Sequence, residues 1–171
     1  MSGAPTHPPL DRALLDGLFR YCYILTGRED AAFDLLQASV EQYYRSTPGS
    51  IDTPSAWLRR VIRNRFIDAL RRRERRTMVP LEAIEGGELS TEMEALEAQV
   101  IAAVDLETVW QTLRPMEREV LHLWAVDGLT AAEIAERTET PRNTILSRLH
   151  RVRRTLRARF GRLAAGGEAS R

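Results

Sequence analysis

Residues 129–154 read LTAAEIAERTETPRNTILSRLHRVRR, and this stretch decides the fold of the C-terminal part of the chain. Thr130 precedes an apolar run and is followed three residues later by Glu133, the capping-box pattern that begins a short helix. Pro141 suits the first position of a second helix, because its fixed φ matches the helix and its missing N–H costs nothing there. A short helix, a turn at residues 138–140 and a longer helix are typical of a helix-turn-helix, the motif that lays its second helix in the major groove of DNA.

This segment has an apolar inner face and a polar outer face. The inner face is expected to hold Leu129, Ile134, Ile145, Leu149 and Val152. The outer face is expected to hold Arg142, Asn143, Leu146, Ser147, His150 and Arg151. Arginine can bind the O6 and N7 atoms of guanine, and asparagine can bind adenine in the same bidentate way. The candidate DNA contacts are therefore Arg142, Asn143, Ser147 and Arg151. For His150, a phosphate contact and a purely surface role fit the pattern equally.

Charge lies in blocks along the chain, although the net charge is only +1. Residues 54–76 carry nine arginines and two acids, residues 77–107 carry eight acids and no base, and residues 137–162 carry nine arginines and one acid. Arginines on an exposed helix are by themselves usually a solvated surface. Their concentration behind a helix-turn-helix pattern instead favours nucleic acid, because arginines that contact phosphates supply most of the non-specific affinity for DNA.

The N-terminal part of the chain predicts two helices before residue 50. Residues 1–9 contain three prolines and are expected to form a flexible tail. Residues 10–25 carry apolar side chains at helical spacing before a Thr-Gly stop. Residues 30–45 form a second helix that ends at a Thr-Pro-Gly-Ser turn. The apolar stripe expected on this second helix is Phe33, Leu36, Val40 and Tyr44.

A third helix is expected to begin at Pro54, with Thr53 as its cap. It interleaves arginines with apolar and aromatic residues. Such a surface can follow a single strand of nucleic acid while an aromatic side chain receives an unstacked base. The arginine run could instead be a solubilising helix end, and Trp57 taken alone is more often a core residue. For the helix as a whole, the pattern favours nucleic acid.

The remaining segments complete an all-α chain of two small helical domains. Residues 77–92 combine proline, glycine and dispersed acids, which suits a flexible linker. Helices are then expected over residues 92–113 and 115–126, with a break at Asp127 and Gly128. The two helices of the helix-turn-helix follow, over residues 131–137 and from Pro141 to about Phe160. No strand pattern competes with these assignments.

The composition argues against several functional classes. Cys22 is the only cysteine, so a disulfide framework is excluded and a buried, inert thiol is expected. The three histidines have no ligand spacing, so no metal is expected. No apolar run approaches the roughly 18 to 20 residues of a membrane span, and the chain has no signal-peptide pattern, so we expect it in the cytoplasm. No nucleophile–base pair or phosphate loop indicates an enzyme, and no cofactor is expected.

These motifs together resemble the extracytoplasmic-function (ECF) group of the sigma-70 family of bacterial transcription-initiation factors, across most of the chain. The sequence DLLQ at residues 34–37 resembles the region 2 helix that docks on the beta-prime coiled coil of RNA polymerase. Residues 57–72, WLRRVIRNRFIDALRR, resemble the segment that melts and reads the minus-10 promoter element. Residues 113–136 and 141–153 resemble region 4, which reads the minus-35 element.

The resemblance implies a region 2 three-helix-type bundle at residues 10–76 and a region 4 domain at residues 93–162, joined by the acidic linker, with a second flexible tail at residues 163–171. It implies core RNA polymerase (beta-prime and beta subunits), promoter DNA and an anti-sigma factor as partners, and no membrane insertion. The implied polymerase contacts are Asp34, Leu35 and Gln37. The implied minus-10 contacts are Trp57, Arg60, Arg63, Asn64 and Arg71. The implied minus-35 contacts are Arg142, Asn143, Ser147, Arg148 and Arg151.

The chain departs from the family's usual pattern at four positions. Phe33 and Ala38 stand where acids are common in the polymerase-docking helix. Glu139 stands where the turn of the helix-turn-helix usually has glycine, and Leu146 where a basic residue usually precedes Ser-Arg. The departures bear on the polymerase contact and on one minus-35 contact.

Two other functions stay open at this point. Residues 113–151 also resemble the DNA-binding domain of quorum-sensing-type regulators, but nothing in residues 10–76 resembles the ligand or receiver domain that such regulators carry. A sigma-like decoy that binds an anti-sigma factor without reading DNA is the other alternative, and the departures at Phe33, Ala38 and Leu146 are what favour it.

Overall fold

The structure is a computed structural model, and it describes residues 7–47, 51–77 and 110–166. All regular secondary structure in these residues is helical, which confirms the predicted all-α class. The chain divides into two compact units, Met1–Glu82 (unit 1) and Ala83–Arg171 (unit 2). Within the described ranges, no helix is long and apolar enough to cross a membrane.

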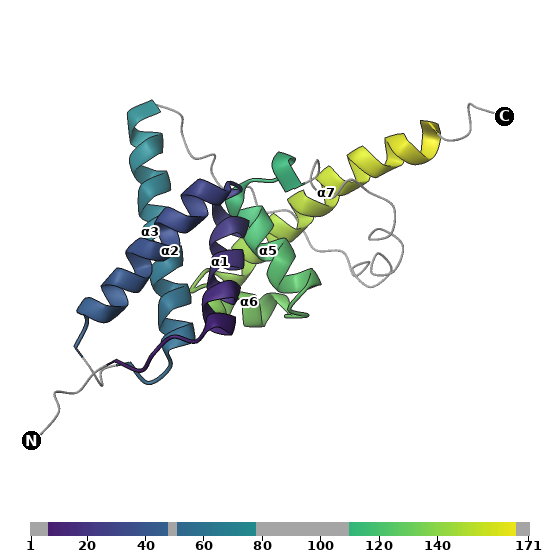
Figure 1. Ribbon diagram of the computed structural model, residues 1–171. Helices are drawn as coiled ribbons and strands as arrows, with labels where there is room; N and C mark the ends of the chain where they lie inside the picture. The colour runs from purple at the N-terminus through teal and green to yellow at the C-terminus, as the bar shows by residue number, and fades with distance from the viewer. Residues whose placement is uncertain (1–6, 48–50, 78–109, 167–171) are drawn as a thin grey trace, which may run out of the picture. The chain divides into compact units, whose positions relative to one another are not determined.

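Unit 1 is a bundle of three helices, α1 (Arg12–Thr26), α2 (Glu29–Arg45) and α3 (Pro54–Thr77), and each packs against the other two (Figure 1). Burial of Cys22 in this bundle raises the pKa of its thiol to about 12. The thiol therefore stays protonated and inert at neutral pH, as predicted. The apolar side chains buried in the bundle are Leu18, Tyr21, Cys22, Ile24, Leu25, Ala32, Tyr43, Leu58 and Ile62.

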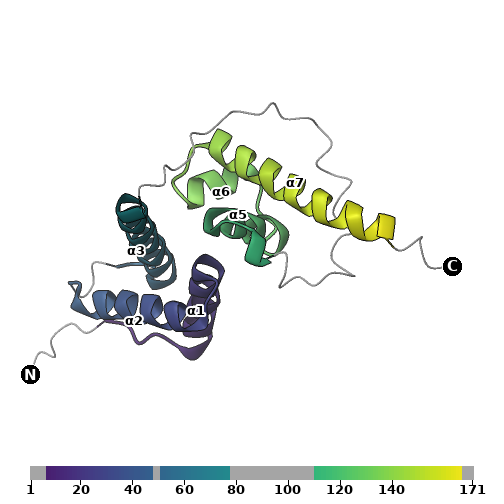
Figure 2. The same cartoon turned by 90° about the horizontal axis from the view of Figure 1, so that it is seen from above.

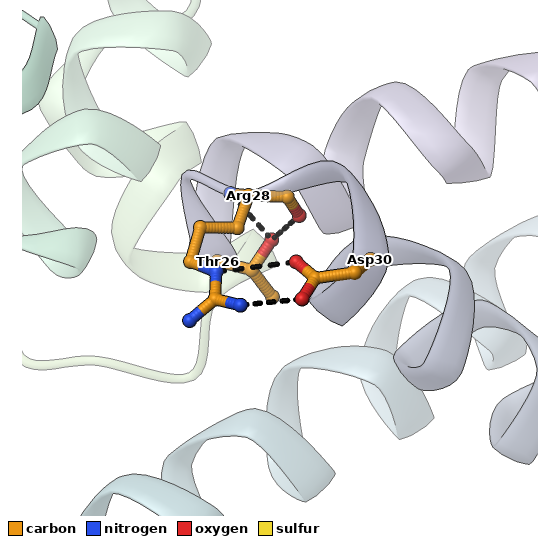
Figure 3. A network of polar contacts seen from close by, with 3 residues as sticks. All are labelled: Thr26, Arg28 and Asp30. Atoms are coloured by element: carbon orange, nitrogen blue, oxygen red, sulfur yellow. Dashed lines mark hydrogen bonds and ion pairs between the residues drawn. The ribbon is translucent and has the colours of Figure 1, made fainter.

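A short corner joins α1 to α2 (Figure 3). Gly27 has a left-handed backbone with φ 70° and donates its N–H to the Tyr23 carbonyl oxygen at 2.8 Å, which ends α1 at the predicted place. The Thr26 hydroxyl lies 3.0 Å from the Arg28 carbonyl oxygen, and the Arg28 guanidinium pairs with the Asp30 carboxylate through two nitrogens. The hydrogen bond from Arg28 lowers the pKa of Asp30. Both charged side chains are exposed, so the pair orients the corner more than it stabilises the bundle.

The buried face of α2 is shifted by one residue along the sequence relative to the predicted stripe. Phe33 and Tyr44 were expected to face the core, but they are 55% and 52% exposed. The buried side chains are instead Ala32, Ser39 and Tyr43. The small residues let the helix approach its neighbours closely, and the Ser39 hydroxyl donates to a carbonyl oxygen one turn earlier at 2.7 Å, so its burial leaves no polar group unpaired.

Residues 7–9, which we call the N-terminal strap, contact the end of α2. The ring nitrogen Nε2 of His7 lies 2.7 Å from the Ser46 carbonyl oxygen, and the Tyr43 hydroxyl donates to the Pro8 carbonyl oxygen at 3.1 Å. His7 and Pro8, which lie within the tail predicted at residues 1–9, thus contact α2, and the flexibility of that tail stays a prediction. Sequence periodicity could not reveal the strap, because its partners lie 35 and 39 residues away. The rest of that predicted tail lies outside the described residues.

Unit 2 contains α5 (Pro115–Ala125), α6 (Ala131–Arg137) and α7 (Arg142–Gly166), and both shorter helices pack against α7 (Figure 2). Its main core is almost entirely aliphatic. Ile134 and Ile145 are fully buried there, as the inner face predicted, and Leu129 packs against the same cluster. The buried residues of this core are Val120, Leu123, Ala131, Ile134, Ile145, Leu146 and Leu149.

Two predicted boundaries can be compared with the structure only in part. The predicted linker at residues 77–92 and most of the helix predicted at residues 92–113 lie outside the described residues, although residues 110–112 are helical. Helix α7 continues to Gly166, beyond the predicted end near Phe160 and into the tail predicted at residues 163–171. The sequence Leu-Ala-Ala at residues 163–165 consists of strong helix formers, which accounts for the extra turn.

Candidate nucleic-acid interface

The helix-turn-helix of unit 2 begins with the predicted capping box. The Glu133 backbone N–H donates to the Thr130 hydroxyl oxygen at 3.3 Å, and the Thr130 backbone N–H donates to the Glu133 carboxylate at 2.8 Å. The Thr130 hydroxyl also donates to this carboxylate at 2.7 Å. These hydrogen bonds lower the pKa of Glu133. The start of α6 is therefore fixed by local contacts that the sequence encodes within four residues.

The turn between α6 and α7 contains a left-handed residue that is not glycine. Glu139 has φ 50°, and it is the only non-glycine residue with positive φ among the described ones. The buried Thr138 donates its hydroxyl to the Ile134 carbonyl oxygen at 2.7 Å, and the Thr140 backbone N–H donates to the Ala135 carbonyl oxygen at 3.0 Å. The turn is thus held on both sides of Glu139 in the conformation for which glycine is the usual choice.

The first turn of α7 presents its first two side chains to solvent, whereas Thr144 is buried. Arg142 and Asn143 are exposed, as is His150 two turns later. Arg148 and Arg151 are half-buried, and one guanidinium nitrogen of Arg148 is itself buried. An arginine and an asparagine at the exposed start of a helix-turn-helix recognition helix have the donor groups that read guanine and adenine edges.

Two residues of the predicted outer face point into the domain instead. Leu146 is 6% exposed and belongs to the aliphatic core of unit 2. Ser147 is 9% exposed, and its hydroxyl donates to the Asn143 carbonyl oxygen at 2.9 Å. The outer-face prediction is therefore wrong for Leu146, and Ser147 is largely covered. The apolar side chain of Leu146 was itself the sequence signal for burial, because the basic residue usual at this position would stay in solvent.

A cluster of three polar side chains lies between the end of α5 and the end of α6. Asp127, in the turn after α5, lies 3.7 Å from the His122 ring nitrogen Nε2 and 3.6 Å from a guanidinium nitrogen of Arg137. Gly128 follows with φ 68°, another left-handed position. The cluster ties the end of α5 to the end of α6, so the break predicted at Asp127 and Gly128 is also a point of attachment.

Unit 1 presents a second basic surface on α3. Leu58 and Ile62 are fully buried, which places the helix face opposite them in solvent. Trp57 is half-buried, and its ring lies 6.0 Å from the Tyr43 ring between centroids. The residues at positions 57, 60, 64 and 71 share one face of the helix, with position 63 beside it. Of the predicted minus-10 contacts, Arg60, Asn64 and Arg71 are exposed, and Trp57 and Arg63 are half-buried.

Two other arginines of α3 are engaged within the bundle. The Arg59 guanidinium lies 5.4 Å from the centre of the Tyr21 ring, a cation–π geometry. The Arg65 Nε donates to the Gln42 side-chain oxygen at 2.9 Å. These contacts attach α3 to α1 and α2, so the arginine-rich run has a structural part as well as an exposed part. The sequence does not distinguish the two parts by residue type.

The predicted polymerase-docking residues lie on α2. Asp34 and Gln37 are exposed, and the Gln37 amide donates to the Glu41 carboxylate at 3.2 Å. Leu35 is half-buried. The exposed Phe33 ring lies 4.5 Å from the Phe19 ring between centroids, so an aromatic pair lies beside the predicted docking residues.

Among the residues that the structure describes, no group of three or more His, Cys, Asp or Glu side chains could hold a metal ion. In each unit, the described residues include exposed arginine and asparagine side chains on one helix, α3 in unit 1 and α7 in unit 2. These features define a two-domain, helical DNA-binding protein with a helix-turn-helix in its second domain.

Comparisons with known proteins agree with this class. Residues 10–76 match the family described as Sigma-70 region 2, and residues 103–156 match the family described as Sigma-70, region 4. The chain is 30% identical over 161 residues to the ECF RNA polymerase sigma factor SigE of Mycolicibacterium smegmatis, a match that covers 90% of this chain and 61% of that protein. The chain thus belongs to the ECF group of the sigma-70 family.

A solved structure supports the same fold. The sigma factor RpoE from Bartonella quintana, in its crystal structure with the anti-sigma factor NepR, superposes with a TM-score of 0.54 at 24% sequence identity. The match covers 85% of this chain and 91% of that one.

Proposed function

We propose that this protein is a sigma factor that binds core RNA polymerase and directs it to specific promoters, as a DNA-reading subunit and not an enzyme. The observation that carries the proposal is the presence of an exposed donor face in each of the two units, Arg60, Asn64 and Arg71 in one and Arg142 with Asn143 in the other. A single helix-turn-helix regulator needs only the second face. The site of action would be the cytoplasm, where the polymerase is.

In unit 2, Arg142 and Asn143 would read base edges of the minus-35 element. Arg151 is half-buried and would contact a phosphate with its guanidinium end. Arg148 has a buried guanidinium nitrogen, so only the rest of its guanidinium group would reach a phosphate. Ser147 would support the helix start through its bond to the Asn143 carbonyl oxygen. Leu146 would contact no base. Loss of a bidentate arginine–base contact costs about 1 to 3 kcal/mol of binding free energy.

In unit 1, the exposed face of α3 would contact the minus-10 element. Arg60, Arg63 and Arg71 supply positive charge for the backbone of a separated strand, and Asn64 supplies amide donors and acceptors for bases. The half-buried Trp57 would form the apolar edge of that surface. Binding to a separated strand would favour melting, because the bound bases are no longer available to their complementary strand.

The proposed polymerase contact uses a separate surface, on α2. Asp34, Leu35 and Gln37 would dock on the beta-prime subunit, with the Phe19–Phe33 pair beside them, and unit 2 would contact the beta subunit. An anti-sigma factor is proposed as inhibitor, with the complex of RpoE and NepR as the parallel in a protein of the same fold. The domain limits proposed for this activity are residues 10–76 and 93–162, joined by the acidic segment at residues 77–92, whose charge would disfavour its own binding to DNA.

In-vitro transcription with core polymerase tests the proposal, using DNA fragments from upstream of the protein's own gene. The expected result is a defined start site that requires the protein. This start site should be lost with Arg63→Ala plus Asn64→Ala, and with Arg142→Ala plus Arg151→Ala. A pull-down with core polymerase should remain positive for both variants, since neither pair lies on α2.

A matched control removes two exposed arginines from α1. Arg12→Ala plus Arg20→Ala loses at least as much positive charge as either variant but leaves both proposed faces unchanged, so transcription should continue. Absence of any transcript together with absence of polymerase binding would refute the proposed function. Loss of activity in the α1 control as large as in the two variants would show that total charge, and not the two faces, carries the effect.

A further inference from the structure

The N-terminal strap contacts the end of α2 at Tyr43 and Ser46, and the Tyr43 ring also lies near Trp57 at the start of α3. His7 reaches the Ser46 carbonyl oxygen at 2.7 Å, and Ser46 is the residue that ends α2. Because a carbonyl oxygen only accepts hydrogen bonds, the Nε2 atom of His7 must carry the proton and donate it. The strap therefore completes the end of α2, where backbone carbonyl groups lack partners within the helix.

Tyr43 connects the strap to the start of α3. This side chain is fully buried, its hydroxyl donates to the Pro8 carbonyl oxygen at 3.1 Å, and the His7 ring lies against its ring at 4.6 Å between centroids. The ring of Trp57, in the first turn of α3, lies 6.0 Å away. A chain of contacts thus runs from the strap through Tyr43 to Trp57.

These contacts depend on one another. The Ser46 hydroxyl donates to the Tyr43 carbonyl oxygen at 2.6 Å. Each of the three residues His7, Ser46 and Tyr43 therefore contacts the other two. The Tyr44 ring lies roughly perpendicular to the His7 ring, 6.1 Å away between centroids, and Tyr44 is 52% exposed. Without the strap, the buried Tyr43 hydroxyl would need another acceptor, and the ring would shift toward water or toward Trp57.

We propose that the N-terminal strap is a positioning element for promoter recognition by unit 1. Through Tyr43 and Ser46, it fixes the end of α2 relative to the first turn of α3, and so sets the orientation of Trp57 and of the donor face that continues to Arg60 and Asn64. His7 and Pro8 themselves touch no DNA in this account. The inference rests on the proposed function for its effect on promoters, but its structural part can be measured in the free protein.

The free-protein test uses Trp57 fluorescence. Trp110→Phe plus Trp124→Phe leaves Trp57 as the only tryptophan of the chain. In that background, His7→Ala and Tyr43→Phe should increase acrylamide quenching of Trp57, whereas Tyr44→Phe, which removes a neighbouring hydroxyl that the strap does not bond, should not. His7→Gln retains an N–H donor and should restore most of the protection. Equal quenching in the Trp57-only protein and in its four variants would overturn the inference and leave the proposed function unaffected.

The promoter test compares melting with polymerase binding. With core polymerase on an active promoter, Tyr43→Phe should reduce permanganate-detected melting about fivefold, the factor that one neutral hydrogen bond is worth. Polymerase affinity and protection of the upstream element should remain at the wild-type level, and Tyr44→Phe should melt the promoter normally. Normal melting by His7→Ala and Tyr43→Phe would overturn the inference, as would equal loss of melting and polymerase binding, which indicates general unfolding. An inactive wild type with normal strap-dependent quenching would refute the proposed function and the strap's promoter role together.

Discussion

Units 1 and 2 are both small helical bundles, but they are held together over different distances in the sequence. In unit 2, the start of α6 is fixed by Thr130 and Glu133, three residues apart. In unit 1, the end of α2 is fixed by the strap, from 35 and 39 residues away. Unit 2 has an aliphatic core, whereas unit 1 buries two tyrosines and a cysteine. Local rules therefore describe unit 2 well, while unit 1 depends on contacts that only the folded chain brings together.

The largest expected losses of stability come from substitutions that leave a cavity in the core of one unit at a time. Leu25→Ala in unit 1 and Ile145→Ala in unit 2 each remove a fully buried side chain, at a cost of about 2 to 5 kcal/mol of unfolding free energy. Alkylation of Cys22 reports unit 1, because the folded thiol is both buried and protonated. Leu25→Ala should speed this alkylation strongly, and Ile145→Ala should leave it unchanged. Equal acceleration by both variants would show that the two units unfold together.

The next largest effects are expected from substitutions at two left-handed residues of unit 2. One substitution should lower the unfolding free energy and the other should raise it. Gly128 has φ 68° with open space around its Cα, so Gly128→Ala should cost about 1 to 2 kcal/mol through backbone strain alone. Glu139 already bears that strain at φ 50°, so Glu139→Gly should stabilise unit 2 by about 0.5 to 1 kcal/mol after the entropy cost of glycine.

Urea unfolding followed by tryptophan fluorescence measures both changes. Glu136→Gly is the matched control, because it makes the same substitution inside α6 and should destabilise by about 1 kcal/mol. Destabilisation by Glu139→Gly would mean that contacts of the Glu139 side chain outweigh the backbone strain.

The smallest effect is a pH dependence of the capping box. The pKa of Glu133 lies below its ordinary value of 4.5 in the folded protein, so the folded state binds this proton less readily than the unfolded state. Its contribution to stability is present above pH 4.5 and is lost as the pH falls through the lower, folded value. Glu133→Gln keeps an acceptor but does not titrate.

Thermal unfolding at pH 7, 4 and 3 should therefore show a smaller loss of unit 2 stability for Glu133→Gln than for the wild type. The other acids of the chain titrate in both proteins and cancel in the comparison. Identical losses would contradict the role given to this carboxylate.

The sequence predicted most of the helical framework, because caps and stops are local signals. Thr130 with Glu133, Pro54 and Gly27 each mark a helix end that the structure has at the same place. The stripe of α2 was misassigned because hydrophobicity favoured Phe33 and Tyr44, whereas close packing selects the small Ala32 and Ser39. Hydrophobic pattern alone does not measure how closely two helices approach.

The candidate site was predictable in its residue types but not in the exposure of each one. Arg142 and Asn143 lie in solvent as expected, yet Leu146 completes the core, and Arg59 turns inward onto Tyr21. Arginine runs provide both outward and inward side chains, and only the packing of the bundle separates them. The strap was not predictable, because three prolines near a chain end look like a tail.

The most direct test of the central claim, that the two units read separate promoter elements, is a combined footprint of the polymerase complex on an active promoter. Permanganate detects melted bases at the minus-10 element, and DNase I detects protection at the minus-35 element. Arg63→Ala plus Asn64→Ala should abolish melting and retain upstream protection, whereas Arg142→Ala plus Asn143→Ala should lose upstream protection first. Loss of both signals by both variants, with polymerase binding intact, would contradict the division of labour between the units.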